Sequence, residues 1–166
     1  MKLAKNLDRL GTETAFSVLA EAKKLEAQGE EMIHLGLGQP DFMTPKHIME
    51  AAKKAIGDGF TGYCPGAGIP ELRAALARDV GAKRGINYSA ENVSIQPGGK
   101  PVIGKFISAV MNPGEEVLYP NPGYPIYESQ IEYQGGVAIP YGYHETPDGF
   151  SLDFEAIERG ISKNTK

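Results

Sequence analysis

Apolar and polar positions along this chain follow two periods, and each period predicts one kind of secondary structure. Apolar residues spaced three and four apart predict amphipathic helices over residues 13–29, 45–56, 70–81, 99–111 and 124–133. Alternating apolar and polar residues predict a strand at residues 92–96, and short apolar runs indicate strands at residues 32–35, 116–119 and 137–139. A last helix is expected from Asp153, as its N-cap, through Glu158.

The order of these elements predicts an α/β fold with three layers, in which helices cover both faces of a mainly parallel sheet. Thr44 is expected to cap the helix that starts at Pro45, because proline is favoured at the first helical position. The alternating strands and helices from residue 92 onward lead to the polar residues 161–166, where another strand is due. Since a parallel sheet needs further neighbouring strands, we expect the chain to form an incomplete α/β domain.

Composition narrows the classes of function without choosing one. The 166 residues are 41% hydrophobic and 23% charged, which is ordinary for a globular protein. A formal net charge of −4 argues against nucleic-acid binding, and the single cysteine, Cys64, cannot form an internal disulfide. No apolar run approaches the length of a membrane span, and the N-terminal residues lack the apolar stretch of a signal peptide. We therefore expect a cytoplasmic protein that binds neither membranes nor nucleic acids.

Gly98-Gly99-Lys100 lies between the predicted strand 92–96 and the predicted helix 99–111. A glycine pair at this junction lets backbone N–H groups face outward, and the helix N-terminus adds roughly half a positive charge. That arrangement is typical of a phosphate-binding site, although a plain turn between a strand and a helix also explains the glycines. The Walker A and G-x-G-x-x-G patterns are both absent here, so neither an ATPase nor a nicotinamide enzyme is indicated.

Other kinds of catalytic site find little support in the sequence. His34, His47 and His144 are isolated and lack the spacing of metal ligands, so we expect no metal site. No G-x-S-x-G segment occurs, and the acidic residues form no pair of the kind that glycosidases use.

Several motifs occur in an order and with gaps that together resemble one enzyme family. They are Leu-Gly-Leu-Gly-Gln-Pro-Asp-Phe at 35–42, Tyr-Cys-Pro-Gly-Ala-Gly-Ile-Pro-Glu-Leu-Arg at 63–73, Pro-Gly-Gly-Lys at 97–100, Asn-Pro-Gly-Glu-Glu-Val at 112–117 and Asn-Pro-Gly-Tyr-Pro-Ile-Tyr at 121–127. The chain resembles the fold-type I pyridoxal-phosphate-dependent aminotransferases of class I/II, in particular the aspartate-aminotransferase-like enzymes. The resemblance extends over nearly the whole chain and concerns the N-terminal portion of the family's fold.

The resemblance implies the cofactor pyridoxal 5'-phosphate and assigns residues to it. The turn at Gly98, Gly99 and Lys100 matches the family's phosphate-binding turn, in which the amides of the last two residues bind the phosphate. Tyr124 matches the aromatic residue that stacks on the pyridine ring. Lys100 is not expected to be the Schiff-base lysine, because the family places that residue far downstream.

The resemblance also implies a homodimer whose active site is shared between subunits. Tyr63 matches a tyrosine that reaches the phosphate of the neighbouring subunit's cofactor, and Gly38 matches a glycine close to the substrate carboxylate. Residues 1–40 are expected to form an N-terminal arm and part of a small domain. Residues 41–166 are expected to form the first half of a large cofactor domain.

The function implied is transfer of an amino group between an amino acid and a 2-oxo acid by a longer parent chain. The family's Schiff-base lysine and its other catalytic groups fall beyond Lys166, so we expect no catalytic residue within this chain and no activity from the chain alone. Two alternatives stay open. One is another fold-type I enzyme, a lyase or synthase, and the other is a non-catalytic truncated module for binding or dimerisation.

Overall fold

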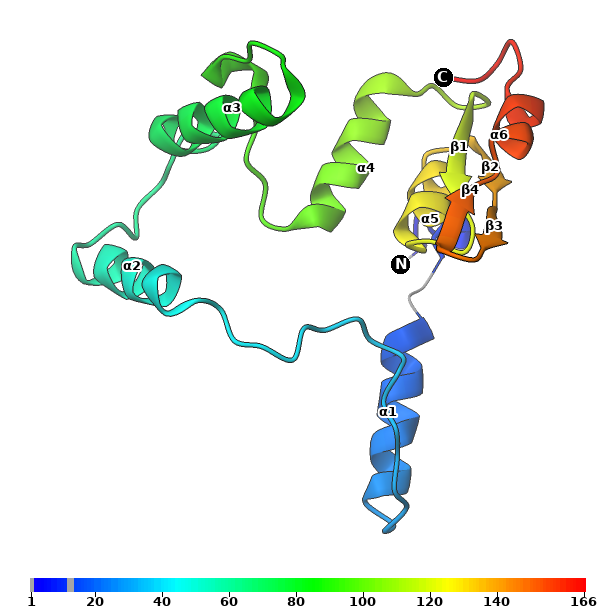
Figure 1. Ribbon diagram of the computed structural model, residues 1–166, viewed down its shortest axis with the longest axis horizontal. Helices are drawn as coiled ribbons and strands as arrows, with labels where there is room; N and C mark the ends of the chain where they lie inside the picture. Colours follow the sequence, from blue (N-terminus) through cyan, green and yellow to red (C-terminus); the bar gives the residue numbers. More distant parts are fainter. Residues whose placement is uncertain (1, 12–13) are drawn as a thin grey trace. The chain divides into compact units, whose positions relative to one another are not determined.

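The computed structural model describes residues 2–11 and 14–166 of the chain (Figure 1). Contacts between residues divide the chain into two compact units. The first unit combines Met1–Leu37 with Gly98–Lys166, and the second unit is Gly38–Pro97. These units are groupings by contact within this chain, so the small-domain and large-domain boundary expected near residue 40 stays a prediction.

A βαβ unit forms the centre of the first unit. Strand β1 (Glu116–Pro120) leads through helix α5 (Ile126–Tyr133) to strand β2 (Val137–Tyr141), which pairs with β1 in parallel. The register places Leu118 opposite Ile139. Both predicted strands and the predicted helix between them are confirmed, with ends shifted by one or two residues.

The two faces of this parallel pair pack against different helices. On one face, Tyr119 joins Ile107, Met111 and Ile131, which come from helix α4 (Gly99–Val110), the residue after it, and α5. On the other face, Leu118 and Ile139 lie next to Gly160 of helix α6 (Phe154–Gly160). Because side chains alternate between the faces of a strand, the pair is covered on both sides, which is a small helix–sheet–helix arrangement.

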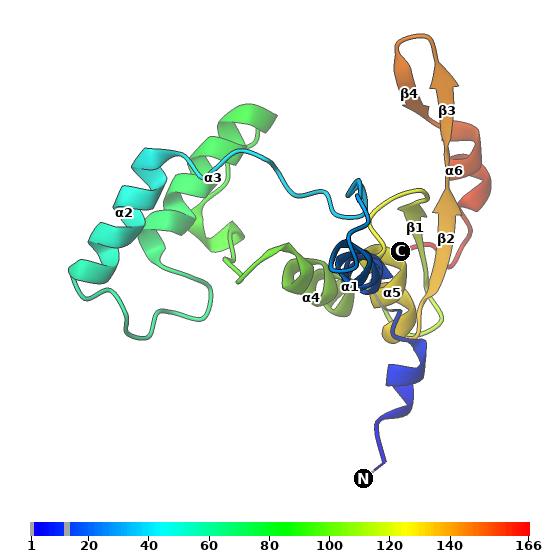
Figure 2. The ribbon, with the colours of Figure 1, turned by 90° about the horizontal axis from the view of Figure 1, so that it is seen from below.

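The sheets in the described part of the chain are small. Thr165 forms an isolated parallel bridge with Glu116, at the edge of β1, and β1 and β2 form the rest of that sheet. Strands β3 (Tyr143–Thr146) and β4 (Gly149–Leu152) form a separate antiparallel hairpin that extends beyond the β1–β2 pair (Figure 2). The mixed α/β class is therefore confirmed, whereas the larger, mainly parallel sheet stays a prediction.

The N-terminal residues of the first unit contact α5. The 3-10 helix η1 (Lys5–Arg9) brings the Arg9 guanidinium to the carbonyl of Glu132, with an Nε–O distance of 2.8 Å, and the Ser129 hydroxyl donates to the carbonyl of Gly11 at 3.1 Å. Helix α1 (Thr14–Glu26) follows, and the predicted helix start at residue 13 lies outside the described residues.

The strand predicted at residues 32–35 is wrong. These residues have no strand conformation, and the side chains of Ile33 and Leu35 are exposed. A strand requires a neighbouring strand for its N–H and C=O groups, and the two sheets among the described residues include none beside this segment. The short apolar run predicted a strand, but it did not indicate whether a neighbouring strand is present.

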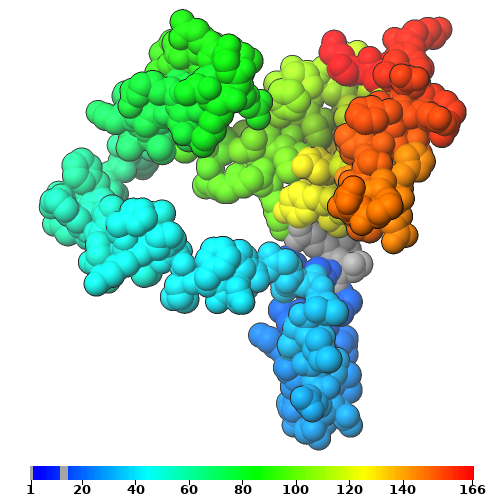
Figure 3. Space-filling model, in the orientation of Figure 1, coloured from blue at the N-terminus to red at the C-terminus, as the bar shows by residue number. Residues whose placement is uncertain are grey.

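The second unit contains helix α2 (Lys46–Gly57), helix α3 (Pro70–Arg84) and the short 3-10 helix η2 (Ala90–Asn92). Its α3 helix packs against η2, in the compact group drawn in green in Figure 3. Pro45, not Thr44, occupies the N-cap position of α2, so the predicted Thr44 cap is wrong. Helix α3 continues through Gly81 and ends at Gly85, whose φ of 66° is left-handed.

Residues 92–96 do not form the predicted sheet strand either. Val93 is extended, with φ of −120° and ψ of 128°. The hydrogen bonds of the segment go elsewhere: the Ile95 amide donates to the carbonyl of Ala67 at 2.9 Å, and the Arg73 guanidinium donates to the carbonyl of Val93 at 2.9 Å. A loop and a side chain therefore take the place of a neighbouring strand.

Candidate cofactor site

The junction before α4 has the backbone geometry of an anion-binding turn. Gly98 occupies the N-cap position with φ of 99° and ψ of 165°, a conformation that L-residues with a Cβ rarely adopt. No side chain caps the helix, and its first turn holds no acidic residue. The first amides of a helix lack partners within it, so these groups and the helix dipole favour an anion.

The turn is also open enough for a ligand to approach its backbone. A Cβ built on Gly98 or on Gly99 would have no heavy atom within 4 Å, apart from those of the residue itself and its chain neighbours. Both residues are exposed. Glycine at these positions leaves the amides uncovered, which fits the phosphate end of a cofactor.

Lys100 adds positive charge to the first turn of α4. Its ammonium group lies 5.6 Å from the centroid of the Phe16 ring on α1, within the range of a cation–π interaction. The aromatic ring therefore holds the lysine side chain near the start of the helix. This contact is absent from the sequence prediction, because Phe16 is far from Lys100 in the chain.

Tyr124 lies just before α5, in the same unit as the glycine turn. Its side chain is 39% exposed, and its ring meets the ring of Tyr127 edge to face, with centroids 6.0 Å apart and planes at 89°. Tyr127 packs against the buried cluster of the first unit. The partly buried Tyr127 thus contacts one side of the Tyr124 ring, while part of Tyr124 is accessible to a ligand.

A sharp turn precedes Tyr124. The peptide bond between Asn121 and Pro122 is cis, and a Cβ on Gly123 would collide with the carbonyl oxygen of Pro120. Only glycine fits so close to that carbonyl. The Asn-Pro-Gly-Tyr motif therefore encodes the turn that ends β1 and presents Tyr124 ahead of α5.

Tyr63 and Gly38 belong to the second unit, where each lies on an exposed loop. The Tyr63 side chain is fully exposed, and a Cβ on Gly38 would meet no atom within 4 Å. The structure thus brings Gly98, Gly99, Lys100 and Tyr124 into one unit and places Tyr63 and Gly38 in the other. Their assignment to a cofactor and a substrate stays a prediction.

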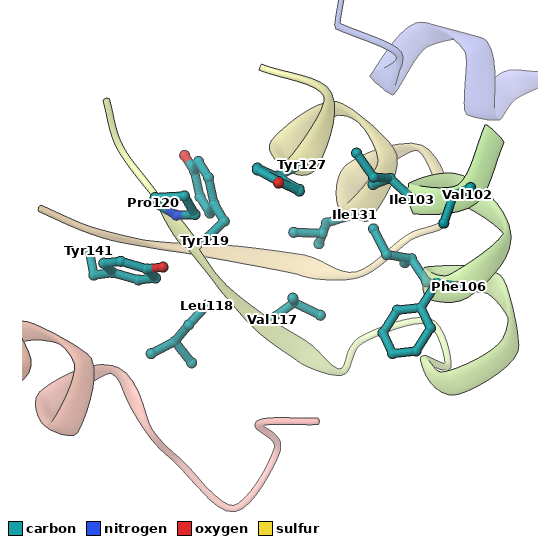
Figure 4. Close-up of a pocket in the computed structure, with 11 residues that line it drawn as sticks. Val102, Ile103, Phe106, Val117, Leu118, Tyr119, Pro120, Tyr127, Ile131 and Tyr141 are labelled. Carbon is teal, nitrogen blue, oxygen red and sulfur yellow. The ribbon is translucent and has the colours of Figure 1, made fainter. Parts of the chain in front are cut away.

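An apolar groove lies in the first unit between α4, β1, β2 and α5, with a volume of about 420 Å³. Figure 4 shows Ile103, Phe106, Tyr119 and Tyr127 among the side chains that line it. Burial, followed by a hydrogen bond with the Glu128 carboxylate, raises the pKa of Tyr119 to about 12. Val117, Leu118 and Tyr119 are consecutive and indicate apolar side chains on both faces of β1, but the groove itself depends on long-range packing.

Two carboxylates with shifted pKa values serve helix and turn structure. The Asp153 side chain accepts a hydrogen bond from the Ala156 amide at 2.8 Å, which lowers the pKa of Asp153 and confirms the predicted cap. The Asn112 amide donates to the Glu115 carboxylate at 2.6 Å and lowers the pKa of Glu115. Both contacts stabilise the positive end of a helix or turn with a negative charge.

Among residues 2–11 and 14–166, no group of three or more His, Cys, Asp and Glu side chains is placed to hold a metal ion. Over the same residues, none of the helices has both the length and the apolar character that a bilayer crossing requires.

A family model of class I and II aminotransferases matches residues 30–166. The chain belongs to this family. It is 35% identical over 166 residues to the aspartate/prephenate aminotransferase of Thermus thermophilus, an alignment that covers 99% of this chain and 42% of the relative. It is 40% identical over 155 residues to a probable N-acetyl-LL-diaminopimelate aminotransferase of Bacillus subtilis, covering 93% of this chain and 39% of that protein.

Solved structures of the family match the fold over the same portion. The alanine aminotransferase of Pyrococcus furiosus superposes with a TM-score of 0.90 at 29% identity, covering 99% of this chain and 42% of that one. The Thermus thermophilus aspartate aminotransferase with maleate gives a TM-score of 0.88 at 34% identity, covering 100% and 43%. The chain is thus aspartate-aminotransferase-like, and it spans about two fifths of the length of the relatives it matches.

Proposed function

We propose that this chain is the N-terminal portion of a pyridoxal-phosphate-dependent aminotransferase, which transfers an amino group between an amino acid and a 2-oxo acid. Membership of the class I and II family supports the reaction type, and enzymes of this family generally use pyridoxal phosphate. The relatives named above differ in their amino acid, so the proposal stops at the substrate class.

One observation carries the cofactor assignment: the uncovered backbone of the turn at Gly98 and Gly99, at the N-terminus of the 12-residue helix α4. The donor set consists of backbone amides with a lysine beside them, and it suits a phosphate monoester dianion.

The residues of this chain have distinct roles in the proposal. The amides of Gly99 and Lys100 hold the phosphate, and the Lys100 ammonium adds charge to the same end of α4. The ring of Tyr124 packs on the cofactor ring. When bound, pyridoxal phosphate supplies the electron sink for removing the α-proton of the amino acid.

Two residues of the second unit have roles in the proposal, and one of them, Tyr63, acts through dimerisation. Tyr63 is proposed to donate its hydroxyl to the phosphate held by the other subunit of a homodimer. Gly38 is proposed to lie beside the substrate carboxylate, where the absence of a side chain lets the backbone approach it. The full exposure of the Tyr63 side chain within this chain supports a partner outside its own unit.

We also propose that the 166-residue chain is catalytically inactive by itself. None of the residues assigned to it moves the α-proton, because the assigned groups are phosphate donors and a stacking ring. A transamination assay on the purified chain, with pyridoxal phosphate, an amino acid and a 2-oxo acid, should therefore show no turnover above a blank. Sustained turnover that copurifies with the chain would contradict this part.

Binding of pyridoxamine 5'-phosphate to the chain tests the cofactor turn. This probe carries the phosphate but no aldehyde, so it does not react with surface lysines. Calorimetry should show tighter binding of this probe than of pyridoxamine, by about tenfold or more, because a charge-assisted phosphate contact exceeds about 1.4 kcal/mol. Equal affinities for the two probes would contradict a phosphate site.

Two substitutions at Gly99 separate charge from size. Gly99→Asp places a carboxylate at the position proposed for the phosphate, and we expect the affinity for pyridoxamine 5'-phosphate to fall at least about tenfold through like-charge repulsion. Folding should be retained, since an acidic residue in the first turn of a helix stabilises it by about 0.3–1 kcal/mol. Gly99→Asn has the same size without the charge and should weaken binding less. An equal loss in both variants would point to obstruction, not to an anion site.

A further inference from the structure

Arg73 makes the contact that holds the chain just upstream of the glycine turn. It lies in the first turns of α3, and its side chain is only 14% exposed. The guanidinium Nε donates to the carbonyl oxygen of Val93 at 2.9 Å, across 20 residues of sequence. A second guanidinium nitrogen lies 3.6 Å from the Glu91 carboxylate, which is 86% exposed. The half-buried bond to Val93 is therefore the stronger contact, since exposed ion pairs contribute little.

A loop holds the same segment from its other end. Gly68 has a φ of 100°, and a Cβ on it would lie 2.6 Å from Cβ and Cγ1 of Ile95. The Ile95 amide donates to the carbonyl of Ala67 at 2.9 Å. The loop and the arginine together fix two points of one extended stretch, at Val93 and at Ile95.

This stretch runs directly into the turn. Pro97 follows two residues after Ile95, and its ring restricts φ to about −65°. Gly98 comes next with its left-handed φ. Only Gln96 and Pro97 separate the held segment from Gly98, so the contacts at Val93 and Ile95 lie within a few residues of the turn.

We propose that Arg73 is a positioning residue, which holds the segment Val93–Pro97 so that the amides of the following glycine turn are ordered for an anion. The part that concerns the anion rests on the proposed function, whereas the ordering of the segment rests on the contacts above. Arg78 on the same helix offers a contrast, because its side chain is exposed.

The test compares Arg73→Met, which keeps the length of the side chain and removes its donors, with Arg78→Met and Glu91→Gln. Hydrogen exchange of the full chain is followed by mass spectrometry or NMR. In Arg73→Met, the amides of Val93 and Ile95, which donate to the carbonyls of Ala90 and Ala67, should exchange about tenfold faster or more, as expected for loss of a charge-assisted hydrogen bond beside them. The amides within α3 should keep their wild-type rates. Both control variants should match the wild type throughout.

Affinity supplies a second readout. Arg73→Met should weaken binding of pyridoxamine 5'-phosphate by about threefold to tenfold and leave binding of pyridoxamine unchanged, since the lost order concerns the phosphate donors. Arg73→Lys keeps the charge but not the planar donor group, so it should restore the exchange rates only in part.

Two results would overturn the proposal. One is unchanged exchange of the Val93 and Ile95 amides in Arg73→Met. The other is an equal rise of exchange in α3 and in this segment, which would make Arg73 a general stabiliser of the second unit. If the wild-type chain shows no preference for the phosphorylated probe, the proposed function fails, and the exchange data still decide whether Arg73 orders the segment.

Discussion

Both units of this chain contain helices of 12 residues or more, but the units differ in what they bury. In the first unit, four large side chains form a cluster between α4, α5 and β1, and Ile131 is only 1% exposed. In the second unit, the buried residues among those described are small: Gly68, Ala77 and Gly81. A parallel strand pair thus gives its helices a surface to cover, whereas the helices of the second unit lack one within their own unit.

Helix α2 illustrates this difference in burial between the units. Its apolar residues recur at helical spacing, yet none of its residues is buried, and Ile56 is 68% exposed. An amphipathic pattern marks the face that a helix can bury, but it does not say what covers that face. The first unit therefore has its own hydrophobic core, whereas the second unit depends more on local contacts.

Truncating one isoleucine in each unit should change the free energy of unfolding by very different amounts. Ile131→Ala should lower the free energy of unfolding by about 2–5 kcal/mol, since it removes buried methyl groups and leaves a cavity beside Met111 and Tyr119. Ile56→Ala in α2 should change it by less than about 0.5 kcal/mol. Urea denaturation followed by far-UV circular dichroism measures both.

Equal losses of unfolding free energy in the two variants would contradict this difference between the units. That result would mean that the apolar face of α2 is covered in solution. A control for helix propensity is built in, because both substitutions replace isoleucine by alanine within a helix.

A smaller effect is expected where the second unit depends on a close backbone approach. Gly68→Ala should cost about 1–3 kcal/mol of local stability, because its φ is positive and the new Cβ would overlap the Ile95 side chain. Gly66→Ala, in the same loop with open space around it, should be close to neutral. Hydrogen exchange of residues 93–97 reports the difference. Wild-type exchange in Gly68→Ala would show that the loop does not hold the segment.

The same contrast explains which elements could be predicted from sequence. Helix α4, helix α5 and the strands β1 and β2 follow from local periodicity within one βαβ unit, and their prediction is confirmed. The strand predicted at residues 92–96 is wrong because its partners, Ala67 and Arg73, are not a strand. The β3–β4 hairpin was missed, although Pro147-Asp148-Gly149 is a turn signal between its strands.

Some features of the candidate site could likewise be predicted from sequence, and others could not. The glycine turn could be predicted because the positive φ of Gly98 and the start of α4 are encoded within a few residues. The contact of Lys100 with Phe16 and the edge-to-face packing of Tyr124 on Tyr127 depend on the folded chain. Arg73 was part of a recognised motif, but only its hydrogen bond to Val93 shows what it holds.

A pH dependence of stability is expected in the first unit. Burial raises the pKa of Tyr119 in the folded chain from 10.0 to about 12, so the folded state binds this proton more tightly than the unfolded state does. The corresponding stability is fully present below pH 10 and is lost as pH rises from about 10 to 12. Tyr119→Phe removes this titration, so its unfolding free energy should fall less steeply across that window than that of the wild type. Tyr143→Phe, at an exposed position of β3, should keep the wild-type slope. Urea denaturation at several alkaline pH values measures these slopes. Identical slopes for Tyr119→Phe and the wild type would show that ionisation of Tyr119 does not contribute to the pH dependence of the unfolding free energy.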